Sequence, residues 1–188
     1  MLPLVYLSIK SDPSISDEQK QKEDEYKEYV DEHVQNVKRA WKKLSQNKKF
    51  KEYIKTVTDH EKLLYTFVDT LIENHDYTKY GIDEWEGYRK WYFPVDEQEK
   101  EDATRLQEMA WEHHYENNPH HWDCWYKHNN IDEMLLEYVI EMCCDWIAMS
   151  MKFGSNALDW YHSQKDIVLG EKQKIWVENI LKANYSVD

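Results

Sequence analysis

The stretch that decides the fold is residues 17–46, which read DEQKQKEDEYKEYVDEHVQNVKRAWKKLSQ. Apolar side chains recur in it at spacings of three and four, which is the repeat of one face of an α-helix. This apolar stripe consists of Tyr26, Val30, Val34, Val37, Ala40, Trp41 and Leu44. Ser16 and Gln19 fit a capping box at its start. Because His33 lies within the stripe, we expect a long helix that carries a histidine on its buried face.

Helical spacing continues on both sides of this stretch. A second capping box, Thr58 with Glu61, predicts the start of a helix that ends at His75. We expect further helices at about 48–57, 82–93, 96–117, 132–153, 156–163 and 171–184, with Asp132 as a cap and residues 120–125 irregular. No stretch alternates convincingly with a period of two, so we predict an all-α protein. We expect residues 1–15 to form an irregular N-terminal arm and residues 16–188 to form one helical domain.

The charge balance restricts the partners. Lys and Arg number 24 and Asp and Glu number 37, which gives a net charge of −13. A body this acidic repels nucleic-acid backbones and anionic membranes, so we expect neither duplex nucleic acid nor a membrane as a partner. The N-terminus has no basic region of the kind that opens a signal peptide. Three cysteines, of which Cys143 and Cys144 are adjacent, do not form the disulfide framework of a secreted protein. We therefore expect a cytoplasmic protein.

Histidines and aspartates at buried positions predict a metal site. Four candidate ligands lie on separate predicted helices or helix ends, each on or next to a buried face: His33, His75, Asp76 and Asp145. An ionised carboxylate that is buried costs much free energy unless it is paired or bound to a cation. Imidazole and carboxylate ligands suit Mn, Fe, Co, Ni or Zn. A divalent transition metal with open coordination positions lowers the pKa of bound water.

The order of these residues resembles the signature of the HD superfamily of metal-dependent phosphohydrolases. Residues 73–81, ENHDYTKYG, are similar to its His-Asp-x-x-Lys-x-Gly form, and residues 141–146, EMCCDW, are similar to the helix that bears its last Asp. More closely, the chain resembles an uncharacterised HD-like family of phages and bacteria, from about residue 30 to residue 162. The segments that carry this likeness are HVQNV (33–37), HDYTK (75–79), AWEHH (110–114), NNPHHW (117–122), EMCCDW (141–146) and WY (160–161).

The HD resemblance implies roles for individual residues. It implies a helical fold with one metal held by the four ligands above, and a Lys79 that neutralises a substrate phosphate. Some HD proteins bind a second metal through two more histidines, for which the candidates here are His113, His114, His120 and His121. His114 and His121 are only seven residues apart, closer than such ligands usually lie in HD proteins with two metals. We therefore favour phosphate binding or general-acid catalysis by His114 and His121 over a second ion.

Two further features adjoin these residues. Glu141 lies one helical turn before Asp145, so we expect it to orient a metal ligand from behind. Trp122 and Trp125 lie next to the second pair of histidines, and one of them could stack on a base.

The resemblance predicts a metal-dependent phosphohydrolase that acts on a small phosphate ester, with a nucleotide as the favoured substrate, through metal-activated water and one or two ions. Lys79, His114 and His121 are its expected catalytic residues. Two alternatives remain open: an HD-type di-iron oxygenase, and a non-catalytic binding or inhibitor protein of the phage type. If the chain is phage-encoded, its place is the host cytoplasm. A homodimer is also left open.

Overall fold

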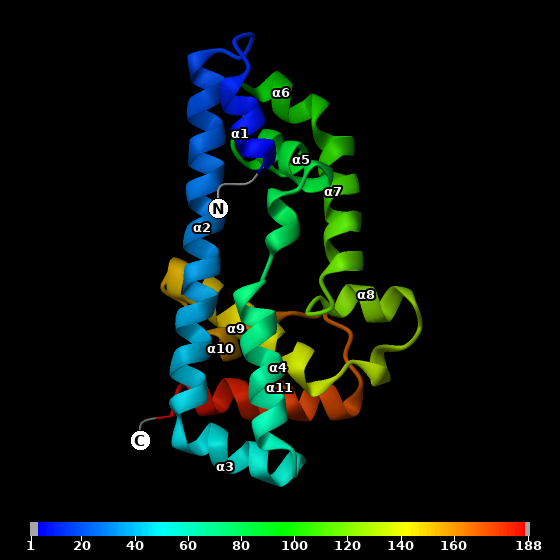
Figure 1. The fold of residues 1–188 in the computed structure, drawn as a ribbon. Helices are drawn as coiled ribbons and strands as arrows, with labels where there is room; N and C mark the ends of the chain where they lie inside the picture. Colours follow the sequence, from blue (N-terminus) through cyan, green and yellow to red (C-terminus); the bar gives the residue numbers. More distant parts are fainter. Residues whose placement is uncertain (1–3, 187–188) are drawn as a thin grey trace. The chain divides into compact units, whose positions relative to one another are not determined.

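The computed structural model describes residues 4–186, and every regular element within that range is a helix (Figure 1). The all-α prediction is therefore confirmed. The chain divides into two units, each formed by two segments of the sequence. Unit 1 comprises the residues up to 32 together with 76–118, and unit 2 comprises 33–75 together with the residues from 119 onward.

The helices fall into the units as follows. The elements of unit 1 are α1 (Leu4–Ser11), the first part of α2 (Asp17–Gln46), the 3-10 helix η1 (Tyr77–Tyr80), α5 (Ile82–Tyr92), α6 (Glu97–Asp102) and α7 (Thr104–Asn117). The elements of unit 2 are the rest of α2, α3 (Lys48–Val57), α4 (Glu61–Glu73), α8 (Trp122–Lys127), the 3-10 helix η2 (Ile131–Glu133), α9 (Leu136–Phe153), α10 (Ala157–Ser163) and α11 (Glu171–Asn184).

The long helix begins as its capping box predicts. The Ser16 backbone N–H donates to Gln19 Oε1 at 3.0 Å, and the Gln19 N–H donates to Ser16 Oγ at 3.1 Å. The second capping box is wrong in detail, because Thr58 Oγ1 accepts from the His60 N–H instead, at 3.0 Å, and α4 begins at Glu61. The predicted starts and ends of α3, α10 and α11 agree with the structure within one residue.

Four predictions of local structure are wrong. Two of them concern segments that we expected to be irregular, and tertiary contacts explain why these segments are helical. Residues 4–11 form α1 where we expected an irregular arm. Tyr6 Oη and Lys10 Nζ both bond to Asp24, which holds this short helix in place. Residues 122–127 form α8 where we expected an irregular segment. Here Trp125 Nε1 donates to the Pro119 carbonyl at 2.8 Å, and Trp122 and Trp125 are packed against the apolar core of unit 2.

The other two errors concern where helices break. Helix 96–117 is interrupted at Ala103, which separates α6 from α7. The buried Arg89 holds Glu99 of α6 and so sets the direction of that helix. The predicted helix 132–153 begins only at Leu136, and Asp132 does not cap it. Gln173 Nε2 donates to the backbone carbonyls of Asp132 and Met134, at 3.0 and 2.9 Å, and so stabilises the preceding turn instead.

Unit 1 has a small core in which polar groups are buried beside aromatic rings. Helix α5 packs against α7, and Gly87 permits their close approach, since a Cβ there would lie 2.5 Å from the Leu106 carbonyl oxygen. The rings of Trp85 and Tyr26 meet edge to face with centroids 4.8 Å apart. The polar and charged residues buried in this unit are Glu23, Asp76, Thr78, Glu84, Arg89, His114 and Asn118.

Unit 2 has an apolar core of the usual kind. Helix α9 packs against α4, α10 and α11, and α11 also packs against α3 (Figure 1). The second half of α2 contributes the part of its stripe from Val37 to Leu44. Cys143 and Cys144 are both buried in this core, and burial raises the pKa of each thiol, so they are inert apolar fillers.

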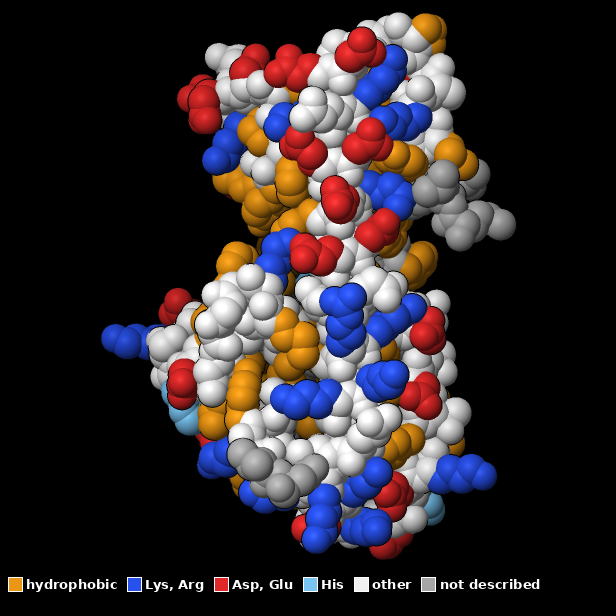
Figure 2. All heavy atoms as spheres, turned by 90° about the vertical axis from the view of Figure 1, so that its left-hand side faces the viewer, with side chains coloured by type: hydrophobic (Ala, Val, Ile, Leu, Met, Phe, Trp, Pro, Cys, Tyr) orange, Lys and Arg blue, Asp and Glu red, His pale blue; other side chains and the backbone are white. Residues whose placement is uncertain are grey.

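The charges along α2 change sign with position. Acidic residues prevail up to Glu32, and from Lys38 onward the charged residues of the helix are all basic. Figure 2 shows Lys and Arg side chains gathered over this second half and over α3. The distribution complements the helix macrodipole, which favours anions at the N-terminus and cations at the C-terminus. Within residues 4–186 no helix combines the length and apolarity needed to cross a membrane.

Candidate functional site

Three predicted ligands converge in unit 2. His33 comes from α2, His75 follows the last turn of α4, and Asp145 comes from α9. His33 Nε2 lies 3.3 Å from His75 Nε2 and 3.2 Å from Asp145 Oδ1. Both histidines are buried, and the Asp145 side chain is 16% exposed. The structure therefore brings together the three residues that the sequence places 42 and more positions apart.

Each of these two distances suits a pair of ligands on one metal ion. Two atoms that each lie about 2.1 Å from one ion are themselves about 3.0–3.4 Å apart in octahedral or tetrahedral geometry. Two imidazole nitrogens and a carboxylate oxygen form the mixed donor set that first-row transition metals prefer. Without a proton or a cation among them, lone pairs at this separation would repel each other. His33 therefore has a suitable separation from His75 and from Asp145 for each pair to share one ion.

Glu141 lies behind two of the histidines. Its Oε1 accepts a hydrogen bond from His75 Nδ1 at 2.9 Å and lies 3.4 Å from His120 Nδ1. Burial alone would raise the pKa of Glu141, but the charge of His120 and the hydrogen bonds from His120 and His75 hold it down at about 2. The ionised carboxylate therefore places the His75 proton on Nδ1. This leaves the lone pair on His75 Nε2, which faces His33, and a metal requires that tautomer.

The Glu141→Gln variant should bind the metal about 10- to 100-fold more weakly, because an amide orients His75 less strongly than a carboxylate does. Competition with a chromophoric chelator measures this. Glu133→Gln, at an exposed position on η2, is the matched control and should bind as the wild type does. Wild-type affinity in Glu141→Gln would show that the Glu141 carboxylate does not tune the site.

The two histidines after Pro119 differ in their surroundings. His120 is buried, and its ring lies 4.5 Å from the His75 ring between centroids. His121 is half-buried, with its ring 4.3 Å from that of His120. Within unit 2, His120 thus lies beside the Glu141 carboxylate, and the expected role of His121 stays a prediction.

In unit 1, Asp76 has an unusual backbone. Its φ is 57° and its ψ is 19°, a left-handed conformation that Asp and Asn tolerate better than most residues with a side chain. The Lys79 N–H donates to the Asp76 carbonyl at 3.0 Å and so begins η1. The same turn brings Lys79 Nζ to 2.6 Å from Asp76 Oδ2, as their three-residue spacing suggests.

Glu84 is a residue of the site that the sequence analysis missed. It is fully buried on α5, and its two oxygens lie 2.7 Å from His113 Nδ1 and 2.8 Å from His114 Nδ1. His114 is buried, and its Nε2 lies 3.3 Å from Asp76 Oδ1, whereas the His113 side chain is 36% exposed. The available signal was the position of Glu84 one turn before Tyr88 on the buried side of that helix.

The predicted helix break after Asn117 is confirmed, and Asn118 has a structural role there. Its Nδ2 donates to the His114 carbonyl at 2.7 Å and to Thr78 Oγ1 at 2.8 Å. These bonds connect the end of α7 to η1 within unit 1. They hold His114 and Asp76 on a common scaffold.

The predicted site residues thus fall into two groups. Unit 2 contains His33, His75, His120, His121, Glu141 and Asp145, and unit 1 contains Asp76, Lys79, His113 and His114. Asp76 follows His75 directly in the chain but is described within unit 1. Its role as the fourth metal ligand therefore stays a prediction. That His114 and His121 face one cavity also stays a prediction.

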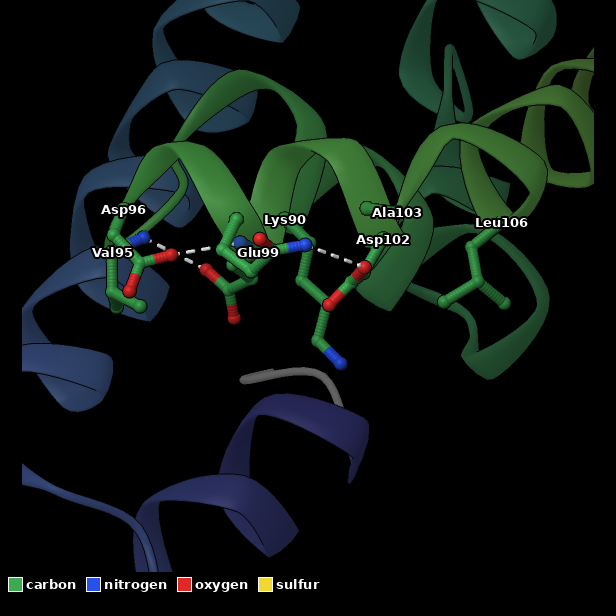
Figure 3. A pocket seen from close by; sticks show the side chains of 8 residues that line it. Lys90, Val95, Asp96, Glu99, Asp102, Ala103 and Leu106 are labelled. Atoms are coloured by element: carbon green, nitrogen blue, oxygen red, sulfur yellow. Dashed lines mark hydrogen bonds between the residues drawn. The ribbon is translucent and has the colours of Figure 1, made fainter.

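Unit 1 contains a cavity whose carboxylates are all paired within the chain. It has a volume of about 320 Å³ beside α6, and carboxylates line it (Figure 3). Each carboxylate has a partner in the chain: Asp96 accepts from the Glu99 N–H at 2.8 Å, Asp102 accepts from Gln98 Nε2 at 3.0 Å, and Glu99 binds Arg89. We therefore assign no ligand to this cavity.

The fold and the site define an all-α protein with a buried cluster of histidines and carboxylates that could hold a metal ion. The chain belongs to a family of unknown function (DUF5662), whose model matches residues 22–183. Neither the comparison with curated proteins nor the comparison with solved structures gives a match.

Proposed function

We propose that this protein is a metal-dependent phosphohydrolase that acts on a small phosphate ester, with a nucleotide as the favoured substrate. One observation carries the proposal: His75 Nε2 and Asp145 Oδ1 both lie within 3.3 Å of His33 Nε2. The ionised Glu141 behind His75 supports it, since ligand histidines commonly donate their second N–H to a carboxylate. The resemblance of the His-Asp motif to HD phosphohydrolases supplies the reaction class.

Different residues would bind the metal, bind the phosphate and transfer the proton. His33, His75 and Asp145 would hold the metal, with Asp76 as the predicted fourth ligand. A divalent transition metal supplies Lewis acidity there and lowers the pKa of a coordinated water molecule. Lys79, held at 2.6 Å by Asp76, provides a positive charge for the substrate phosphate. A histidine protonates the leaving oxygen or binds the phosphate, since its unperturbed pKa is near ~6.5.

Metal analysis followed by a substrate screen tests the proposal. Purified protein should contain a transition metal, and protein reloaded after chelation should release phosphate from nucleotides or generic phosphate esters. Absence of any bound metal would overturn the proposal. Oxygen-dependent turnover with the absorption of a di-iron centre would instead indicate the oxygenase. Bound metal and nucleotide without turnover would indicate the binding protein.

The Lys79→Ala variant should keep its metal and lose about 10- to 100-fold in kcat/KM, because one charged contact to the phosphate is removed. Elemental analysis and steady-state kinetics on a phosphate ester measure the two effects. Lys48→Ala is the control, since the Lys48 side chain is 78% exposed on α3. Loss of metal in Lys79→Ala would assign Lys79 to the structure of the site instead.

Metal stoichiometry decides the role of His114. If His114 binds phosphate or acts as an acid, His114→Ala should keep the wild-type metal content and lose about 100-fold in kcat. His113→Ala is the control, because His113 shares the Glu84 carboxylate but is partly exposed. Two ions per chain that fall to one in His114→Ala would overturn this preference in favour of a second metal.

A further inference from the structure

Unit 1 contains a second cavity whose lining is mostly aromatic. It has a volume of about 120 Å³ and lies among α2, η1, α5 and α7. Five rings and one cation surround it: Tyr26, Tyr29, Tyr88, Tyr92, Trp111 and Lys79. None of the metal ligands predicted above lines this cavity, so it is a separate feature of the unit.

Two of the tyrosines that line this cavity have buried hydroxyl groups. Tyr26 is 2% exposed and Tyr88 is 5% exposed. Within residues 4–186 neither hydroxyl has a hydrogen-bond partner. Buried polar groups are nearly always hydrogen-bonded in folded proteins, so these two exceptions require an explanation. Burial raises the pKa of both hydroxyls, and each therefore keeps its proton and can donate it.

The rings of the same cavity offer flat apolar faces. Tyr92 is 59% exposed and Trp111 is 37% exposed, although both belong to helices of the unit. Large aromatic side chains that remain accessible at a cavity are suited to stack on a planar ring. A ring seated between such faces could place a polar edge against buried hydroxyl donors.

Lys79 is the basic residue of this lining. Its Nζ lies 6.0 Å from the centroid of the Tyr88 ring and 2.6 Å from Asp76 Oδ2. It therefore joins the aromatic cavity to the residue that follows His75 in the chain. A ligand with an anionic group near Lys79 and a planar ring against Tyr92 and Trp111 would use all three kinds of group.

We propose that this cavity recognises the base of a nucleotide. The base stacks on Trp111 and Tyr92, the hydroxyls of Tyr26 and Tyr88 donate to acceptors on its edge, and Lys79 faces the phosphate. The assignment rests on the proposed function for its phosphate ester and adds the part of the substrate that gives specificity. Binding of the base does not require the metal, so the two proposals can fail separately.

Titration of the chelator-treated full-length protein tests this assignment. Nucleoside 5′-monophosphates, ribose 5-phosphate and inorganic phosphate are added in parallel, and calorimetry measures each affinity. At least one nucleoside monophosphate should bind about tenfold or more tightly than ribose 5-phosphate, because stacking contributes only where a base is present. Equal affinity for ribose 5-phosphate and for all the nucleotides would overturn the proposal.

Two variants locate the binding at this cavity. Tyr88→Phe removes only the hydroxyl, and Trp111→Leu removes a stacking face; each should weaken nucleotide binding about 5- to 20-fold without changing the affinity for ribose 5-phosphate. Tyr65→Phe is the matched control, because Tyr65 also has a buried hydroxyl with no hydrogen-bond partner in the described chain but does not line the cavity. Wild-type nucleotide affinity in both variants would overturn the assignment. If the protein as purified contains no metal but binds nucleotides, the assignment of this cavity is supported and the proposed phosphohydrolase activity is refuted.

Discussion

The Asp145→Asn variant should lose metal affinity by at least about 100-fold, more than is typical for a residue that only orients a ligand. Asp145 contributes the carboxylate that lies 3.2 Å from His33 Nε2. Asn has nearly the same shape, so α9 should keep its packing, but its neutral amide oxygen is a poor substitute for an anionic ligand. The variant should therefore be folded, almost free of metal, and inactive towards phosphate esters. Elemental analysis and circular dichroism on the same sample measure both properties.

A matched control separates the loss of a ligand from the loss of a charge. Asp166→Asn removes one carboxylate from an exposed position of unit 2 and should retain the wild-type metal content. Asp76→Ala should lose metal as Asp145→Asn does, if the residue after His75 is the fourth ligand. Full occupancy in Asp145→Asn would remove this aspartate from the metal site. Full occupancy in Asp76→Ala would remove Asp76 alone.

The Arg89→Met variant should lose about 3–5 kcal/mol of stability, the range found when one partner of a buried ion pair is removed. Arg89 is 3% exposed and serves two carboxylates. Its Nε lies 2.8 Å from Glu23 Oε1, and its two terminal nitrogens lie 2.7 and 2.9 Å from the oxygens of Glu99. Burial already raises the pKa of Glu23, so without the guanidinium this carboxylate would be still more costly. Urea denaturation measures the change.

Replacing the carboxylates as well distinguishes lost charge pairing from lost packing. The triple variant Glu23→Gln, Glu99→Gln and Arg89→Met leaves no buried charge in this group, and it should regain a substantial part of the lost stability. Lys48→Met, at an exposed position of α3, should change stability by less than about 0.5 kcal/mol. A loss below about 1 kcal/mol in Arg89→Met would show that solvent replaces the guanidinium at little cost.

Local pattern was sufficient for the helices whose stabilising contacts are close in sequence. The start of α2 depends on a capping box that spans Ser16 to Gln19, and its apolar stripe repeats at helical spacing. The start of α9 was beyond such reasoning. It depends on Gln173 of α11, whose amide bonds to the carbonyls of Asp132 and Met134 across about 40 residues of sequence.

The same division applies to the candidate site. Helical phase was enough to place His33 on a buried face, which the structure confirms. The expected burial of Asp145 suggested a ligand, because an ionised carboxylate there needs a partner, and in the structure its side chain is 16% exposed. Phase could not choose between His113 and His114, which are adjacent on α7. The Glu84 carboxylate lies within 2.8 Å of both, and only packing against α5 decides that His114 is the buried one.

The sequence by itself determined the all-α class, the long helix and the set of residues able to bind a metal, because helical period, capping and side-chain chemistry are local properties. Only the tertiary structure decided that His75 Nε2 and Asp145 Oδ1 both lie within 3.3 Å of His33 Nε2, and that Glu141 fixes the tautomer of His75. It also decided that Tyr26 and Tyr88, whose hydroxyls are buried, line an aromatic cavity. These features depend on distances between atoms that lie far apart in the chain. Helix packing sets such distances, and no periodicity within one helix encodes them.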